Sequence, residues 1–148
     1  MFGGQKGTAR ISLKVQGNDK TVGNSSQKAL TELKEGLQNE RKAYIYHCEN
    51  HYMCPVGFEV QTPELKPLKD EKSFNQKTSI IIADTASAHP TFHNQPWENV
   101  YKDLEQLFPS CFNIRKPEDG LQVRDKPITK AALWRGNNHC IMEFSRTD

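Results

Sequence analysis

A histidine and an aspartate near the middle of the chain have the residue types and spacing of a general base and its orienting acid. His51 opens one predicted strand, and Asp84 closes the next predicted strand along the chain. In cysteine hydrolases the imidazole takes the proton of a thiol, while an acidic or amide partner fixes the tautomer of the ring. The pair therefore indicates cysteine hydrolase chemistry, provided that a thiol completes it.

The cysteines do not offer that thiol. The sequence has four, and all fall in predicted strands or at their ends: Cys48, Cys54, Cys111 and Cys140. A reactive thiol is expected at a helix N-terminus, where the helix amides lower its pKa. The sequence thus predicts buried, reduced thiols, and His51 and Asp84 as remnants of a site. The simpler alternatives are a turn histidine bonded to nearby backbone and an Asx turn or cap at a strand end.

A zinc site is the second hypothesis, because four potential ligands crowd one predicted hairpin: His47, Cys48, His51 and Cys54. Further candidates along the chain are His89, His93, His139 and Cys140. Adjacent residues of a strand point to opposite faces, and the chain has neither a CxxC pair nor a clear HxxxH helix. We therefore expect no metal and no cofactor, and Cys48 and Cys54 packed as small apolar residues.

Hydrophobic spacing predicts the elements that must position these side chains. Alternating or β-rich runs predict strands at Arg10–Val15, Ala43–Cys48, Tyr52–Val60, Thr78–Ala83, Cys111–Ile114, Leu121–Val123 and His139–Phe144. Helical spacing predicts one helix capped by Ser25 or Ser26 and a second running from Pro96 to Phe108. Residues 61–76 and 84–95 are predicted loops, and Lys116–Gly120 a turn. The order indicates an α+β domain with a largely antiparallel sheet and two main helices.

Length and composition limit the classes of function. The chain of 148 residues suits one domain, and its apolar content of 35% is low enough to suggest either generous loops or a face buried by a partner. The net charge is only +2, and the lysines are scattered, so no nucleic-acid partner is expected. No segment has the pattern of a signal peptide or a membrane span, so a cytoplasmic protein without a membrane partner is expected.

Two short motifs resemble papain-like peptidases. Asn50-His51 before Pro55-Val56-Gly57-Phe58 resembles the histidine strand of that fold. Ile80–Asp84 is similar to the Ile-Ala-Asp strand of its bacteriocin-leader-processing branch. The resemblance implies the sheet half of a papain-like fold, with residues 1–21 as an N-terminal arm and first strand and residues 22–148 as a single half-domain.

Longer runs resemble the basic immunoglobulin-like variable motif-containing protein family, from about Val22 to Phe144. They are Ala43–Glu59, His89-Pro90 with Trp97 following, Gly120–Arg124 and Asn138–Ile141. Longer members of that family carry an upstream Ser-Cys-Gly segment leading into a helix, and nothing before residue 22 resembles it. The family name does not establish an immunoglobulin fold.

The resulting expectation is a pseudoenzyme: a structural or interaction protein whose open sheet face is covered by other protein subunits of an intracellular assembly. A cytoskeletal setting, such as the microtubules of a cilium, is the expected location, and Trp134-Arg135 the expected partner contact. The alternative is a cysteine-dependent peptidase or transferase with His51 as base and Asp84 as orienting acid, its thiol supplied by another chain or by an unexpected local cysteine.

Overall fold

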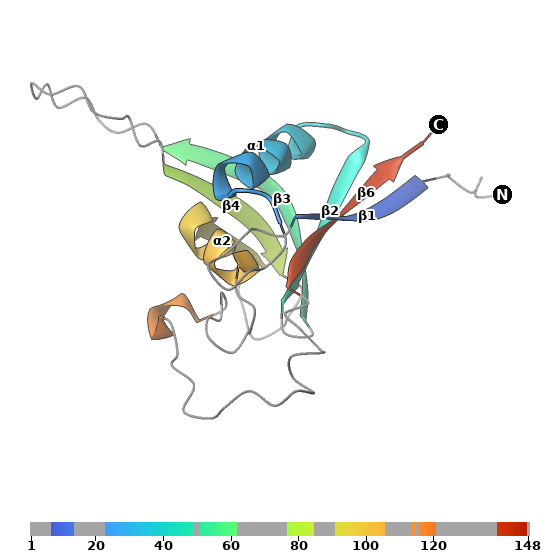
Figure 1. The fold of residues 1–148 in the computed structure, drawn as a ribbon. Helices are drawn as coiled ribbons and strands as arrows, with labels where there is room; N and C mark the ends of the chain where they lie inside the picture. The colour runs from blue at the N-terminus through green and yellow to red at the C-terminus, as the bar shows by residue number, and fades with distance from the viewer. Residues whose placement is uncertain are drawn as a thin grey trace, which may run out of the picture.

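The computed structural model describes residues 7–13, 23–48, 51–61, 77–84, 91–105, 114, 116–120 and 139–147. Within them the elements follow the order β1 (Gly7–Leu13), α1 (Ser26–Leu37), β2 (Lys42–Cys48), β3 (His51–Gln61), β4 (Lys77–Asp84), β5 (Phe92–Pro96), α2 (Trp97–Glu105), η2 (Pro117–Asp119) and β6 (Cys140–Arg146). The strands form one antiparallel sheet in the order β1-β6-β2-β3-β4-β5 (Figure 1). The expected α+β class and antiparallel sheet are confirmed.

The hydrophobic core lies between one face of the sheet and the two helices. Helix α1 contacts β2 and β3, whereas α2 contacts β4 and β5. Alternate residues of the strands are buried toward the helices, as the pleat requires. Both helices and the central strands contribute residues to this core, among them Ala29, Leu33, Tyr46, Met53, Ile80, Ile82, Val100, Leu104 and Ile141. We call this the inner face of the sheet and the opposite one the outer face.

Helix α1 is tied closely to the sheet. Its N-cap is Ser25, whose hydroxyl accepts a hydrogen bond from the backbone N–H of Lys28 at 3.4 Å. Near its other end, a Cβ atom added to Gly36 would lie 1.6 Å from the Tyr44 hydroxyl oxygen. Glycine is therefore required at this position because the Tyr44 ring of β2 passes directly beneath the helix backbone.

Pro55 lacks an amide hydrogen, so it fits a sheet only at an edge, at a bulge, or with its nitrogen facing away from the ladder. It lies in β3, between β2 and β4, and the register with β4 shifts between Pro55 and Gly57. The bulge explains how a residue without an amide hydrogen fits inside the sheet.

One predicted loop contains a strand. Residues 84–95 were expected to be irregular, but Phe92–Pro96 forms β5 and pairs with β4. Pro96 consequently ends this strand instead of opening a helix, and α2 begins at Trp97. The sequence Phe-His-Asn-Gln-Pro lacks the alternation of a half-buried strand, so pairing with β4 determines its conformation.

Other expectations are met only in part. Helix α2 ends at Glu105, and residues 106–108 lie outside the described part of the chain. Short strands were predicted at Cys111–Ile114 and Leu121–Val123. Of these residues only Ile114 is described, and it is buried in a turn. The turn at 116–120 contains η2, and Gly120 follows it with φ of 62°. Trp134 and Arg135 lie outside the described residues.

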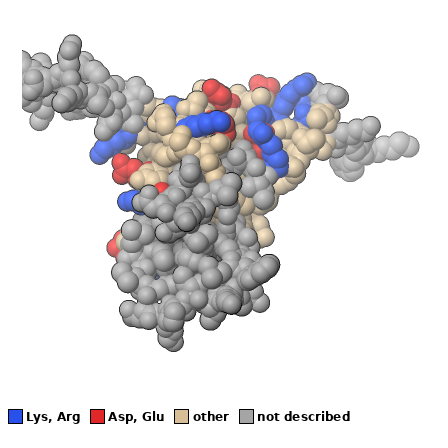
Figure 2. Space-filling model, viewed as in Figure 1, with Lys and Arg blue, Asp and Glu red and all other residues tan. Residues whose placement is uncertain are grey.

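Surface charge is mixed where the described residues are visible. Figure 2 shows basic and acidic side chains interspersed over the α1 side of the molecule. Neither described helix is long and apolar enough to cross a membrane.

Candidate functional site

The antiparallel pairing of β3 with β4 brings His51 and Asp84 together. Met53 is the register partner of Asp84, so the start of β3 lies beside the end of β4. His51 Nε2 lies 2.6 Å from Asp84 Oδ1, and His93 Nε2 of β5 lies 3.3 Å from Asp84 Oδ2. One carboxylate thus joins β3, β4 and β5 where β3 begins and β4 ends. We call His51, Asp84 and His93 the edge cluster.

Burial differs sharply within the edge cluster. The Asp84 side chain is fully buried, whereas the His51 and His93 side chains are 19% and 18% exposed. The backbone N–H of Asp84 also donates to the carbonyl of Thr91 at 2.8 Å, which holds the chain just before β5. The carboxylate is thus shielded from solvent while both imidazoles reach it from partly exposed positions.

This contact specifies the tautomer of neutral His51. A hydrogen bond between Nε2 and a carboxylate requires the proton on Nε2, which leaves Nδ1 as the proton acceptor. His93 additionally lines a small, mostly apolar pocket with Met53, Ile82, Gln95 and Ile114. The edge cluster therefore holds neutral His51 in one tautomer, while its other histidine, His93, lines an apolar recess.

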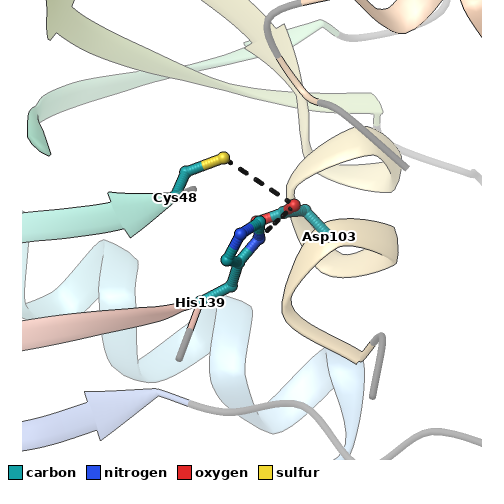
Figure 3. Close-up of side chains that lie close together, drawn as sticks. All are labelled: Cys48, Asp103 and His139. Carbon is teal, nitrogen blue, oxygen red and sulfur yellow. Dashed lines mark hydrogen bonds and ion pairs between the residues drawn. The ribbon is translucent and has the colours of Figure 1, made fainter. Parts of the chain in front are cut away.

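A second carboxylate lies in the core, on helix α2. Asp103 Oδ1 lies 2.6 Å from His139 Nδ1 and 3.9 Å from the Cys48 thiol (Figure 3). The Tyr46 hydroxyl donates to the other carboxylate oxygen. Burial and the adjacent Asp103 raise the pKa of Tyr46 well above its usual value. We call Tyr46, Cys48, Asp103 and His139 the core cluster; each is at most 1% exposed.

The third polar group joins β1, β2 and β6. Glu143 accepts hydrogen bonds from Arg10, Lys42 and Tyr44 at 2.9 to 3.1 Å, and from Ser145 at 3.2 Å. Burial by itself raises the pKa of Glu143, but the hydrogen bonds from Arg10, Lys42 and Tyr44 outweigh it and lower that pKa to about 2. This network stabilises the pairing of β1, β6 and β2, on the side of the sheet away from the edge cluster.

The four ligand candidates of the hairpin occupy separate surroundings. Cys48 belongs to the core cluster and His51 to the edge cluster. His47 packs against Tyr52 with ring centroids 4.8 Å apart, and Cys54 is exposed on the outer face. The strand pleat separates His47 from Cys48 and divides the group.

The thiols are also distributed. Cys48 is the register partner of His51 across the β2–β3 hairpin, so the two residues share the inner face, but its thiol hydrogen-bonds to Asp103. Cys140 is buried and pairs with His47 in the ladder. Cys111 lies outside the described residues.

Sequence reasoning missed Asp103 and the role of His93. Asp103 lies three residues after Val100 and next to Leu104, on the buried stripe of α2. A carboxylate on an apolar helical stripe requires a buried partner, and this was the available signal. His93 had no such signal, because it was placed in a loop and only the pairing of β5 brings it to Asp84.

Known proteins similar to this chain come from one family. Residues 2–148 match the family of basic immunoglobulin-like variable motif-containing proteins. The chain is 37% identical to members from Xenopus tropicalis and Homo sapiens, over 95% of its length and 28% of theirs. It is 31% identical to a Giardia intestinalis member, over 82% of its length and 52% of that protein.

The chain thus spans about a quarter of the length of its vertebrate relatives and about half of the Giardia one. No solved structure matches it. The family resemblance inferred from the sequence is confirmed over a longer range than Val22 to Phe144. This chain belongs to the basic immunoglobulin-like variable motif-containing protein family.

Proposed function

We propose that this chain carries the base half of a thiol-dependent acyl-transfer site, in a cysteine peptidase or transferase acting on peptide or isopeptide bonds. His51 is the general base and Asp84 its orienting acid. The observation that carries the proposal is the 2.6 Å contact of the partly exposed His51 with the fully buried Asp84 carboxylate. A fixed imidazole with one nitrogen available toward solvent is what activation of a thiol requires.

The chemistry follows from that geometry. His51 Nδ1 takes the thiol proton, and the thiolate attacks the carbonyl carbon to form a tetrahedral intermediate. When the intermediate collapses, the C–N bond breaks and His51 returns the proton to the leaving amine. Water or an acceptor amine, deprotonated by His51, then releases the acyl group from sulfur. Asp84 keeps the ring oriented and stabilises the charge that His51 gains.

The order of the two residues supports a papain-like relationship. His51 begins one strand and Asp84 ends its antiparallel neighbour, so the strand order brings base and acid together without any contribution from a loop. The sheet with helices on its inner face agrees with the sheet half of such a fold. We therefore propose a papain-like ancestry for this domain.

The thiol is expected from a segment that packs against the edge cluster. Cys48 is a neighbour of His51 in register, but it is fully buried and bonded to Asp103. The family resemblance implies that longer members have a Ser-Cys-Gly segment leading into a helix, where the thiol would have a low pKa. We propose that such a segment, in the same or another chain, completes the site.

Two experiments test the proposal at different levels. The first uses 15N NMR of the imidazole rings in this chain at alkaline pH. We expect His51 as the Nε2–H tautomer, and conversion to mixed tautomers in Asp84→Ala. A predominantly Nδ1–H tautomer of His51 in the unsubstituted protein would refute the oriented base.

The second experiment measures labelling by an activity-based thiol probe in a full-length family member that contains this domain. We expect one cysteine to be labelled selectively, and His51→Ala to slow labelling at least about 10-fold, since general-base catalysis typically contributes that much or more. His47→Ala is the matched control from the same hairpin and should label at the unsubstituted rate. Uniform labelling, no labelling, or labelling unaffected by His51→Ala would reject the proposed thiol-dependent activity.

The second candidate function is a non-catalytic interaction protein, and the outer face of the sheet favours it. Large apolar side chains are exposed there, namely Tyr52, Val56, Phe92 and Phe144. Contiguous exposed apolar surface commonly marks protein–protein contact. We propose other protein subunits as its partners, and a microtubule-based or other cytoskeletal assembly as the setting.

Substitution on this face separates the candidates. Val56→Lys should abolish association with a copurifying subunit while leaving thiol labelling unchanged if the outer face is the interface. Lys77→Ala, at the start of β4, is the control. Absence of the protein from purified axonemes by mass spectrometry would argue against the ciliary setting.

A further inference from the structure

We propose that the core cluster is a zinc site, with Cys48, Asp103 and His139 as its three protein ligands. The Cys48 sulfur, an Asp103 carboxylate oxygen and a His139 ring nitrogen all lie within 4.8 Å of one another. The three residues come from the end of β2, from α2 and from the residue preceding β6. Figure 3 shows their side chains converging from these elements.

The donor atoms select the metal. Thiolate sulfur and imidazole nitrogen favour Zn²⁺ over Mg²⁺ or Ca²⁺, which take oxygen ligands. A single carboxylate is a common third zinc ligand. The set is therefore unlike the edge cluster, which has two imidazoles and a carboxylate but no sulfur.

Small movements would convert the observed arrangement into a coordination shell. Zinc–ligand distances of about 2.0 to 2.3 Å in a tetrahedron place neighbouring donors roughly 3.3 to 3.8 Å apart. The Cys48 sulfur is already 3.9 Å from Asp103 Oδ1, whereas His139 Nδ1 at 2.6 Å must move away by about 1 Å when its proton is replaced by the metal. Rotation of the carboxylate and imidazole provides that movement.

Charge supports the same assignment. A buried carboxylate requires compensating donors or positive charge, and Asp103 and Cys48 are both 0% exposed. One Zn²⁺ with a thiolate, a carboxylate and a neutral imidazole forms a site of zero net charge. The Tyr46 hydroxyl bonds the second oxygen of Asp103 and would orient this ligand from outside the coordination shell. Because the cluster is closed, binding is expected during folding.

The competing interpretation is a metal-free network in which Tyr46, Cys48 and His139 all donate to Asp103. The two interpretations differ in stoichiometry and in spectrum. The test is therefore metal analysis of the full chain, unfolded in chelator and refolded with excess Zn²⁺ or Co²⁺, followed by removal of free metal.

We expect about one zinc per chain, and with cobalt a sulfur-to-metal charge-transfer band together with the intense visible bands of a tetrahedral ion. X-ray absorption of the zinc form should show one sulfur and otherwise nitrogen or oxygen neighbours. This measurement needs no variant, so it does not depend on whether a substituted core folds. A refolded protein without stoichiometric metal, or with a metal lacking a sulfur neighbour, would overturn the proposal.

Variants identify the sulfur. Cys48→Ser should lose the charge-transfer band and at least about 10-fold in zinc affinity, in protein whose circular dichroism confirms folding. Cys54→Ser is the matched control, since Cys54 lies six residues later in the same hairpin but is exposed. His51→Ala should retain the metal and the band, so this result is independent of the proposed base. A band that survives in Cys48→Ser but not in Cys54→Ser would also reject the site.

Discussion

The core cluster and the edge cluster use the same groups with different solvent access. Each is centred on a buried aspartate that contacts at least one imidazole at 2.6 Å. The His139 side chain of the core cluster is only 2% exposed, whereas the His51 side chain of the edge cluster is 19% exposed. Exposure therefore distinguishes an imidazole that solvent can reach from one that is enclosed in the core.

The difference comes from the location of each aspartate in the fold. Asp103 lies on α2, which covers the inner face, so its partners are enclosed between helix and sheet. Asp84 lies at the end of β4, and it is buried as well, but its imidazole partners His51 and His93 are partly exposed. Carboxylate–histidine pairs in one small domain thus differ in solvent access because of their position in the fold.

The strongest perturbation of the core cluster is expected from its supporting helix. Trp97 is 7% exposed and its indole N–H donates to the Ser26 hydroxyl at 2.9 Å, which links α2 to α1. Trp97→Ala should lower the free energy of unfolding by about 3 to 5 kcal/mol, because it empties a core site. Thermal and urea denaturation measure this. An unchanged melt would show that this face of α2 is not buried.

Substitution of the two aspartates compares the clusters directly. Asp103→Asn should cost about 3 kcal/mol, because the amide cannot accept from all of its buried donors. Asp84→Asn should cost less, about 1 to 2 kcal/mol, since His51 and His93 can turn to water. Urea denaturation at neutral pH gives both values. A larger loss for Asp84→Asn would show that Asp84 depends more than Asp103 on its enclosed hydrogen-bond partners.

The Glu143 network should confer acid sensitivity on the fold. Its folded-state pKa of about 2 lies below the ordinary value of 4.5, so its stabilisation is complete above about pH 4.5 and is lost as pH falls toward 2. The shift corresponds to about 3 kcal/mol. Glu143→Gln should flatten that part of the stability–pH curve. An equally steep acid limb in the variant would assign the effect to other carboxylates.

The smallest effects are expected at the exposed imidazoles. His51→Ala and His93→Ala should each lower the free energy of unfolding by about 1 kcal/mol or less, because Asp84 keeps its other partner. The double variant should lose more than the sum, since the buried carboxylate then has neither imidazole. Chemical denaturation of the three proteins forms the required double-mutant cycle. Strict additivity would show that the histidines act independently of Asp84.

Individual helices and strands were the part of the fold that could be predicted from the sequence. Apolar spacing located α1 and the strands from Ala43 to Cys48, Tyr52 to Val60 and Thr78 to Ala83. The strand Phe92–Pro96 was missed because its polar residues carry no periodic signal, and only the partner strand explains it. Within the site, the proximity of His51 to Asp84 was anticipated from strand order, and the structure shows the contact.

The sequence by itself determined the α+β class, the hairpin that begins β3 with His51, the acid that ends β4, and membership of the family. Only the tertiary structure decided that His93 also meets Asp84 and that His139 meets Asp103. Asp103, Cys48 and His139 come from three elements spread over most of the chain, and their meeting depends on how α2 packs across the inner face. Strand pairing is encoded in short runs of residues, whereas helix packing depends on the shape of the whole core.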